Sequence, residues 1–128
     1  MNKKILFTAA IFGLLSVVFG AFGAHGLKSL ISNEAIQSFE TGVRYQMYHA
    51  ILLLIVGSSS YLKPKSKNAI FYLVLIGIIL FSGSIYGLAT NELTSFDFKT
   101  IALLTPIGGL LLIISWIVLL INIARNKF

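Results

Sequence analysis

The stretch ILFTAAIFGLLSVVFGAFGA, residues 5–24, carries no charged side chain over 20 positions. At a rise of about 1.5 Å per residue, a helix of this length crosses a hydrocarbon core about 30 Å thick. Lys3 and Lys4 precede it, as lysines precede the apolar part of a signal peptide, but that part is usually only about 7–15 residues long. The stretch therefore predicts a transmembrane helix.

Three more apolar segments follow, each long enough, or nearly so, to cross a bilayer. The chain is 57% hydrophobic and 11% charged, far from the roughly one quarter of charged residues in soluble domains. The sequence predicts an all-α membrane protein, a four-transmembrane-helix bundle in a single domain. The predicted spans are 5–25, 45–62, 69–88 and 101–123 within 1–128.

The basic residues lie mostly at the ends of these segments. Seven fall on one side of the predicted membrane: Lys3, Lys4, Lys63, Lys65, Lys67, Arg125 and Lys127. Three fall on the other side, with all four acids: Lys28, Arg44, Lys99, Glu34, Glu40, Glu92 and Asp97. Short basic loops stay in the cytoplasm. We therefore predict a multi-pass membrane protein with both termini in the cytoplasm.

The connection between the first two spans has helical signals of its own. Ser32 or Asn33 can cap a helix, and Glu34 would lie in its first turn. Apolar residues then recur at spacings of three and four, which is typical of an amphipathic helix. We predict an interfacial helix over 33–43, which can run into the second span with a bend at Gly42.

Small residues on the apolar segments indicate close helix packing. They are Gly13, Ser16, Gly20 and Gly23 in the first span and Gly83 and Gly87 in the third. The same stripes can also serve a homo-oligomer or a lipid groove. Pro106, followed by Gly108 and Gly109, predicts a kink in the fourth span.

A polar cluster precedes the apolar part of the second span, and His25 ends the first span, so these residues are expected to meet at the outer interface. The cluster comprises Glu40, Arg44, Tyr45, Tyr48 and His49. We expect a structural network or a ligand-binding site there, with Arg44 as its least replaceable charge. Two histidines at one depth could instead hold haem or another metal, or serve a quinone.

Other classes of function are less well supported. The chain has no cysteine, which excludes disulfides and thiolate catalysis, and its charge of +6 is not gathered on one exposed face as nucleic-acid binding requires. A small oligomeric transporter stays an alternative, although no acid lies well inside a span. We predict no catalytic residue and no cofactor.

Four runs of residues resemble a known family: 20–27 (GAFGAHGL), 41–50 (TGVRYQMYHA), 81–86 (FSGSIY) and 105–109 (TPIGG). In this order and spacing the chain is similar to the YgdD/YwdK-like family of small bacterial inner-membrane proteins, also called domain of unknown function 423. Gly26 stands where that pattern would have Ala. The resemblance implies a four-helix inner-membrane protein and supplies no activity or catalytic residue.

The function expected from the sequence is therefore non-enzymatic. The protein would bind a membrane lipid, a lipophilic small molecule or a partner helix through the outer polar cluster. Its expected partners are lipid, a second copy of the chain or another membrane protein.

Overall fold

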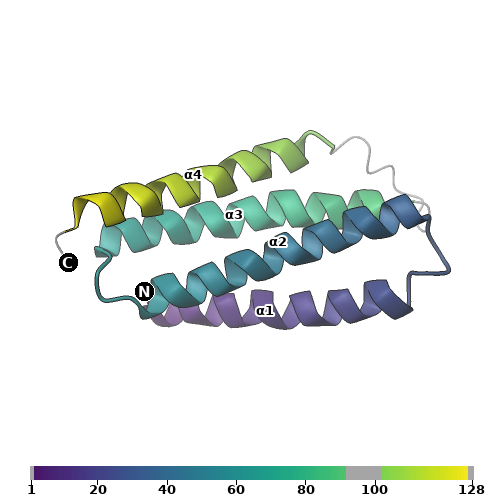
Figure 1. Cartoon of the computed structure of the whole chain (residues 1–128), viewed down its shortest axis with the longest axis horizontal. Helices are drawn as coiled ribbons and strands as arrows, with labels where there is room; N and C mark the ends of the chain where they lie inside the picture. The colour runs from purple at the N-terminus through teal and green to yellow at the C-terminus, as the bar shows by residue number, and fades with distance from the viewer. Residues whose placement is uncertain (1, 92–101, 127–128) are drawn as a thin grey trace.

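The computed structural model describes residues 2–91 and 102–126, which fold into four α-helices lying side by side (Figure 1). The helices are α1 (Asn2–His25), α2 (Asn33–Ser58), α3 (Pro64–Ala89) and α4 (Leu104–Arg125). Among the described residues, α1, α3 and α4 are long and apolar enough to cross a membrane. The prediction of an all-helical fold is confirmed.

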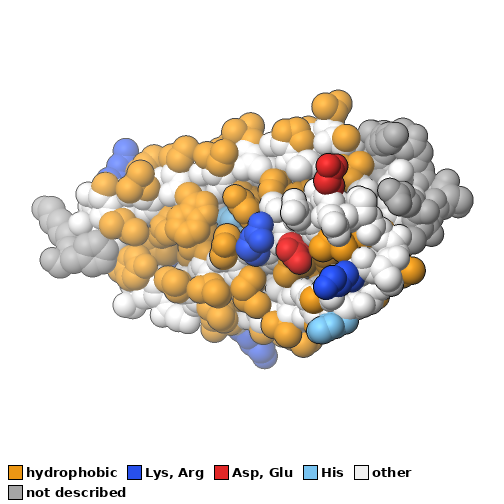
Figure 2. Space-filling model, turned by 45° about the vertical axis from the view of Figure 1, so that its right-hand side comes forward, with side chains coloured by type: hydrophobic (Ala, Val, Ile, Leu, Met, Phe, Trp, Pro, Cys, Tyr) orange, Lys and Arg blue, Asp and Glu red, His pale blue; other side chains and the backbone are white. Residues whose placement is uncertain are grey.

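Helices that are neighbours in the sequence are also neighbours in space. The main contacts run from α1 to α2, from α2 to α3 and from α3 to α4. All four helices contribute to one apolar core, which includes Ile5, Leu53, Ile70 and Leu112. Many other large apolar side chains point outward. They cover much of the face shown in Figure 2, where the acidic side chains in view lie in the right half.

The start of α2 is fixed by a side-chain cap. Ser32 Oγ accepts a hydrogen bond from the N–H of Ala35 at 3.1 Å, and Glu34 lies in the first turn. The helix then continues unbroken, so residues 33–43 are its first part and not a separate interfacial element. Gly42 does not break the helix. This glycine instead lets α2 lie close to α3, since a Cβ built there would lie 2.8 Å from Tyr86 Cε1. The helix ends at Ser58, before the predicted limit at residue 62.

The kink predicted at Pro106 is wrong. The helix α4 begins at Leu104 rather than at residue 101, so Pro106 lies in its first turn. The backbone N–H groups of a first turn have no acceptor within the helix, and proline therefore removes no hydrogen bond there. The helix is continuous through Gly108 and Gly109 to Arg125.

The small-residue face of α1 lies against α2. A Cβ built on Gly23 would lie 2.9 Å from Phe39, one on Gly20 would lie 3.6 Å from Val43, and Ser16 is only 2% exposed. Gly13 is level with Ala50, since its Cβ position is 4.0 Å from Ala50 Cβ. Small side chains here let the two backbones approach closely.

In α3 the predicted packing glycines are not those that pack most closely. Gly83 is exposed, and no described atom lies within 4 Å of a Cβ built on it, while Gly87 borders a hollow. The close contact between α3 and α4 is instead made by Gly77 and Gly108. A Cβ on Gly108 would lie 2.4 Å from the backbone nitrogen of Phe81 and 2.7 Å from the carbonyl oxygen of Gly77.

Candidate functional site

The amide of Gln46, halfway along α2, joins three helices. Its Nε2 donates to the carbonyl oxygen of Phe12 in α1 at 2.9 Å, and its Oε1 accepts from the hydroxyl of Tyr86 in α3 at 2.6 Å. The side chain is 4% exposed. Ser16 donates to the same Phe12 oxygen at 2.8 Å. A buried amide is costly unless it is paired, and this one has a partner for its donor and for its acceptor.

One turn further on, His49 joins α2 to α4. Its Nδ1 lies 2.7 Å from the carbonyl oxygen of Tyr45, and its Nε2 accepts from Trp116 Nε1 at 3.1 Å. A carbonyl can only accept, so Nδ1 must carry the proton. An indole N–H can only donate, so Nε2 must be unprotonated. This geometry assigns His49 as a neutral imidazole with both nitrogens in use.

Hydroxyl groups make further polar contacts between α3 and its neighbours. Ser82 donates to the carbonyl oxygen of Gly42 at 2.7 Å, and Ser84 shares a hydrogen bond with Thr105. These contacts, with Gln46 and His49, form what we call the mid-helix network. It comprises Phe12, Ser16, Gly42, Gln46, His49, Ser82, Ser84, Tyr86, Thr105 and Trp116. Interhelical hydrogen bonds of this kind hold helices together inside membranes.

A hollow of about 320 Å³ opens beside His49, between α2, α3 and α4. We call it the mid-helix hollow. It is lined by Tyr45, His49, Phe81, Gly109, Leu112, Ile113 and Trp116. The ring nitrogens of His49 and Trp116 are paired, and most of the lining is apolar aromatic and aliphatic surface. A smaller hollow of about 210 Å³ lies among Phe19, Phe22, Phe39, Tyr86, Gly87 and Thr90.

The outer cluster predicted from the sequence does not form one site. Glu40 and Arg44 are exposed, and Arg44 Nη2 donates to Thr41 Oγ1 at 3.1 Å rather than to Glu40. Tyr45 and Tyr48 are 40% and 52% exposed, with ring centroids 5.7 Å apart. Only His49 is buried, because it lies on the inner face of α2.

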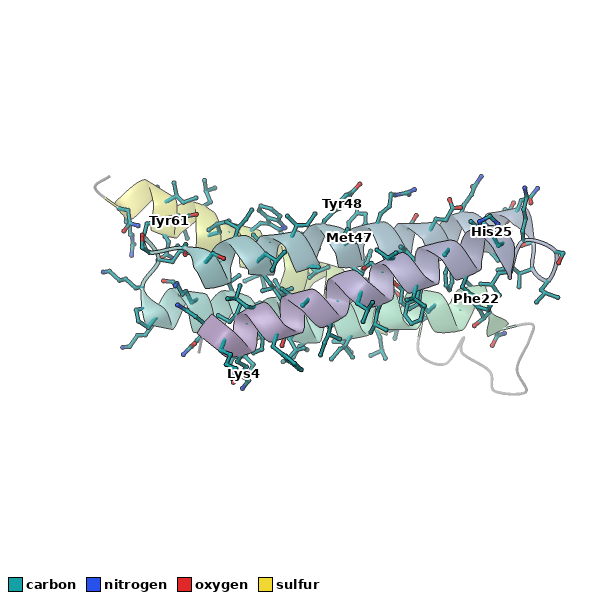
Figure 3. All side chains as sticks on the ribbon, turned by 90° about the horizontal axis from the view of Figure 1, so that it is seen from below. Lys4, Phe22, His25, Met47, Tyr48 and Tyr61 are labelled. Atoms are coloured by element: carbon teal, nitrogen blue, oxygen red, sulfur yellow. The ribbon has the colours of Figure 1, made fainter. Side chains whose placement is uncertain are left out.

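The two histidines lie at different depths. His49 is next to Ala50, which is level with Gly13, and His25 lies twelve residues beyond Gly13, or about 18 Å along α1. Figure 3 shows His25 at the end of α1, away from Met47 and Tyr48 near the middle of the molecule. No cluster of three or more His, Cys, Asp or Glu suited to a metal occurs in the described parts of the chain. The structure therefore does not bring His25 and His49 to one depth, which the alternative of a shared haem or metal site required.

Arg44 should tolerate replacement, contrary to the expectation from the sequence. We expect Arg44→Ala to change the free energy of unfolding by less than about 1 kcal/mol, because the side chain and its hydrogen bond to Thr41 are exposed. The check is a thermal melt in detergent, with exposed Lys28→Ala as the charge-matched control. A much larger loss for Arg44→Ala than for Lys28→Ala would contradict the exposed placement.

Sequence reasoning passed over Gln46, Tyr86 and Trp116. Gln46 and Tyr86 lie within the runs that carry the family resemblance, and Trp116 is the chain's single tryptophan. A signal was present, because an uncharged polar side chain inside a long apolar helix must find a partner. The sequence prediction instead placed the site on the neighbouring charged residues.

Comparison with known proteins agrees with the resemblance. A family profile described as "Protein of unknown function (DUF423)" matches residues 19–109. A UPF0382 membrane protein of Staphylococcus aureus is 40% identical over 126 residues, which cover 98% of each chain. A Haemophilus influenzae UPF0382 membrane protein is 39% identical over 127 residues, 99% of this chain and 98% of its own.

The UPF0382 membrane protein YwdK of Bacillus subtilis is 39% identical over 124 residues, which are 93% of this chain and 94% of that protein. No solved structure is significantly similar. The profile covers most of the chain, and the relatives are similar along nearly their whole length. The relatives described above are all named membrane proteins. The chain therefore belongs to the DUF423 family, which is a family of unknown function.

Proposed function

We propose that the protein crosses the bacterial inner membrane four times, as a four-transmembrane-helix bundle with both termini in the cytoplasm. Of the four proposed crossings, that of α2 requires a physical explanation, because α2 carries more polar residues than the other three helices. The mid-helix network supports its insertion, since Gln46 and His49 find their hydrogen-bond partners inside the protein. The basic residues at the chain ends and in the α2–α3 loop support the orientation.

We further propose that the protein is a non-enzymatic binding protein whose mid-helix hollow holds an acyl chain of a membrane lipid. The observation that carries this proposal is the hollow itself, whose volume of about 320 Å³ lies at the lower end of the range for small-ligand sites. Four aromatic rings, including the imidazole of His49, and two aliphatic side chains line it, and the ring nitrogens of His49 and Trp116 are already hydrogen-bonded.

Gly109 provides room for this guest. A Cβ built there would lie 3.5 Å from Phe81 Cδ1, an ordinary van der Waals contact, so a side chain fits without moving the backbone. A leucine at this position would extend along the wall and fill the hollow. Gly83 offers a matched control, because it is exposed on α3 with no described atom within 4 Å of its Cβ position.

The test is mass spectrometry of the intact protein released from its membrane. Wild type and Gly83→Leu should each carry copurified lipid, and Gly109→Leu should lose most of it while keeping its melting temperature. Retention of the same lipid by Gly109→Leu would refute the mid-helix hollow as the site. A copurified mass matching a quinone or another lipophilic small molecule, or a partner protein lost on filling the hollow, would replace the acyl chain as occupant.

A further inference from the structure

A further hollow lies at the opposite end from the Ser32 cap, where the α2–α3 loop meets the end of α4. Its volume is about 670 Å³, and we call it the basic hollow. Lys63, Pro64, Lys65, Ser66, Ile121, Asn122, Arg125 and Asn126 line it. Three of these eight side chains are cationic and none is acidic, so the basic hollow is complementary to an anion.

Its cations are not neutralised by nearby acids in the part of the chain that the structure describes. Lys63, Lys65 and Arg125 are exposed. Glu34 and Glu40 lie in the first two turns of α2, whereas the basic hollow lies past the other end of that helix, which has 26 residues. At about 1.5 Å per residue the separation far exceeds the Debye length of about 8 Å at physiological salt.

The walls of the basic hollow are held by side-chain hydrogen bonds. Ser66 Oγ donates to Asn122 Oδ1, and Asn122 Nδ2 donates to the carbonyl oxygen of Val118 at 2.8 Å. Asn126 Nδ2 donates to the carbonyl oxygen of Tyr61 at 2.5 Å. These bonds fix the start of α3 and the α2–α3 loop against α4, so the basic residues are mounted on a shaped wall and not on a free tail.

The first turn of α3 adds to the positive potential. Lys63 is its N-cap residue and makes no side-chain cap, Pro64 has no N–H, and no acid lies in this turn. The positive end of the helix dipole therefore faces the same region as the lysines. This contribution is secondary to the three side-chain charges.

An apolar surface adjoins the basic hollow on α4. Ile121 lines the hollow, and Ile117 lies one helical turn closer to the middle of the molecule. They are 44% and 47% exposed. The basic hollow and the adjoining apolar surface together match a molecule with an anionic head and hydrocarbon tails. A free inorganic anion would contact only the basic hollow.

We propose that the basic hollow binds the phosphate-bearing headgroup of an anionic phospholipid in the leaflet on the side of the α2–α3 loop. The phosphate lies among Lys63, Lys65 and Arg125, and the tails run along α4 past Ile121 and Ile117. This inference does not depend on the mid-helix hollow, because the two sites share no lining residue.

The experiment titrates the purified full-length protein in a neutral detergent with phosphatidylglycerol or phosphatidylcholine, with binding followed by native mass spectrometry. Wild type should prefer phosphatidylglycerol. Lys65→Gln/Arg125→Gln should weaken its binding about tenfold or more. Lys3→Gln/Lys28→Gln removes the same net charge outside the basic hollow and should keep the preference. Lys65→Gln alone is a second variant, with an intermediate loss expected.

Three results would overturn the proposal. An equal loss in Lys3→Gln/Lys28→Gln would mean general attraction to positive charge. Equal binding of both lipids by wild type would mean that the basic hollow does not recognise the charge of the headgroup. Thirdly, full displacement of the lipid by millimolar inorganic phosphate would identify a site for the free anion. Gly109→Leu should leave phosphatidylglycerol binding unchanged, which separates this test from that of the mid-helix hollow.

Discussion

Replacing Gly108 with alanine should strongly destabilise the protein. The added methyl group would lie 2.4 Å from the backbone nitrogen of Phe81 and 2.7 Å from the carbonyl oxygen of Gly77. Both atoms belong to the α3 backbone and cannot turn aside as a side chain would, so α3 and α4 must move apart. We expect a loss at the upper end of the usual cost of overpacking, about 3 kcal/mol, visible as a much lower melting temperature in detergent.

Gly83→Ala is the matched control for this substitution. It adds the same methyl group to a helix at a position with no described atom within 4 Å. Alanine is favoured over glycine in a helix by up to about 1 kcal/mol, so this variant should be as stable as wild type or slightly more stable. Similar melting temperatures for Gly108→Ala and Gly83→Ala would contradict the close backbone contact between α3 and α4.

Replacing Gln46 with leucine should cost about 1–3 kcal/mol, because it leaves the Tyr86 hydroxyl without the acceptor that it now has at 2.6 Å. Tyr86→Phe should be milder alone, since Gln46 keeps its bond to Phe12. The double variant should lose less stability than the sum of the two single losses, because both ends of one interaction have been removed. Thermal melts of the three variants measure this coupling.

Tyr48→Phe is the control, since it removes a tyrosine hydroxyl from the same helix on its exposed side. Combined with Gln46→Leu, it should give strictly additive losses. Additivity for Gln46→Leu and Tyr86→Phe as well would show that the two side chains do not share a hydrogen bond, and the mid-helix network would lose its centre.

The sequence predicted the elements of the fold better than their contacts. Long uncharged runs such as residues 5–24 located the helices, because only a helix can satisfy so much backbone in an apolar surrounding. Spacing did not reveal which glycine of α3 meets α4. Gly77 and Gly83 are both small, and only the partner helix makes one of them a close contact.

The site was misplaced for a related reason. Arg44 and Gln46 are two residues apart and therefore point about 200° apart around a helix, so one faces outward when the other faces the core. Which of the two residues faces the core depends on where α1 and α3 pack, and that position cannot be read from the sequence of α2 alone. His49 was assigned to an outer end because α2 was expected to start as a span near residue 45, whereas the helix begins at Asn33.

The order of contacts along the chain has a consequence for biosynthesis. The first acceptor that Gln46 needs, the Phe12 carbonyl, is synthesised before α2 and lies on the helix that packs against it. In the proposed four-span topology, a nascent α1 would therefore shelter the polar face of α2 while the two helices enter the bilayer together as a hairpin. The strongly apolar α1 would thus act as an insertion partner for a helix that is poorly suited to enter lipid alone.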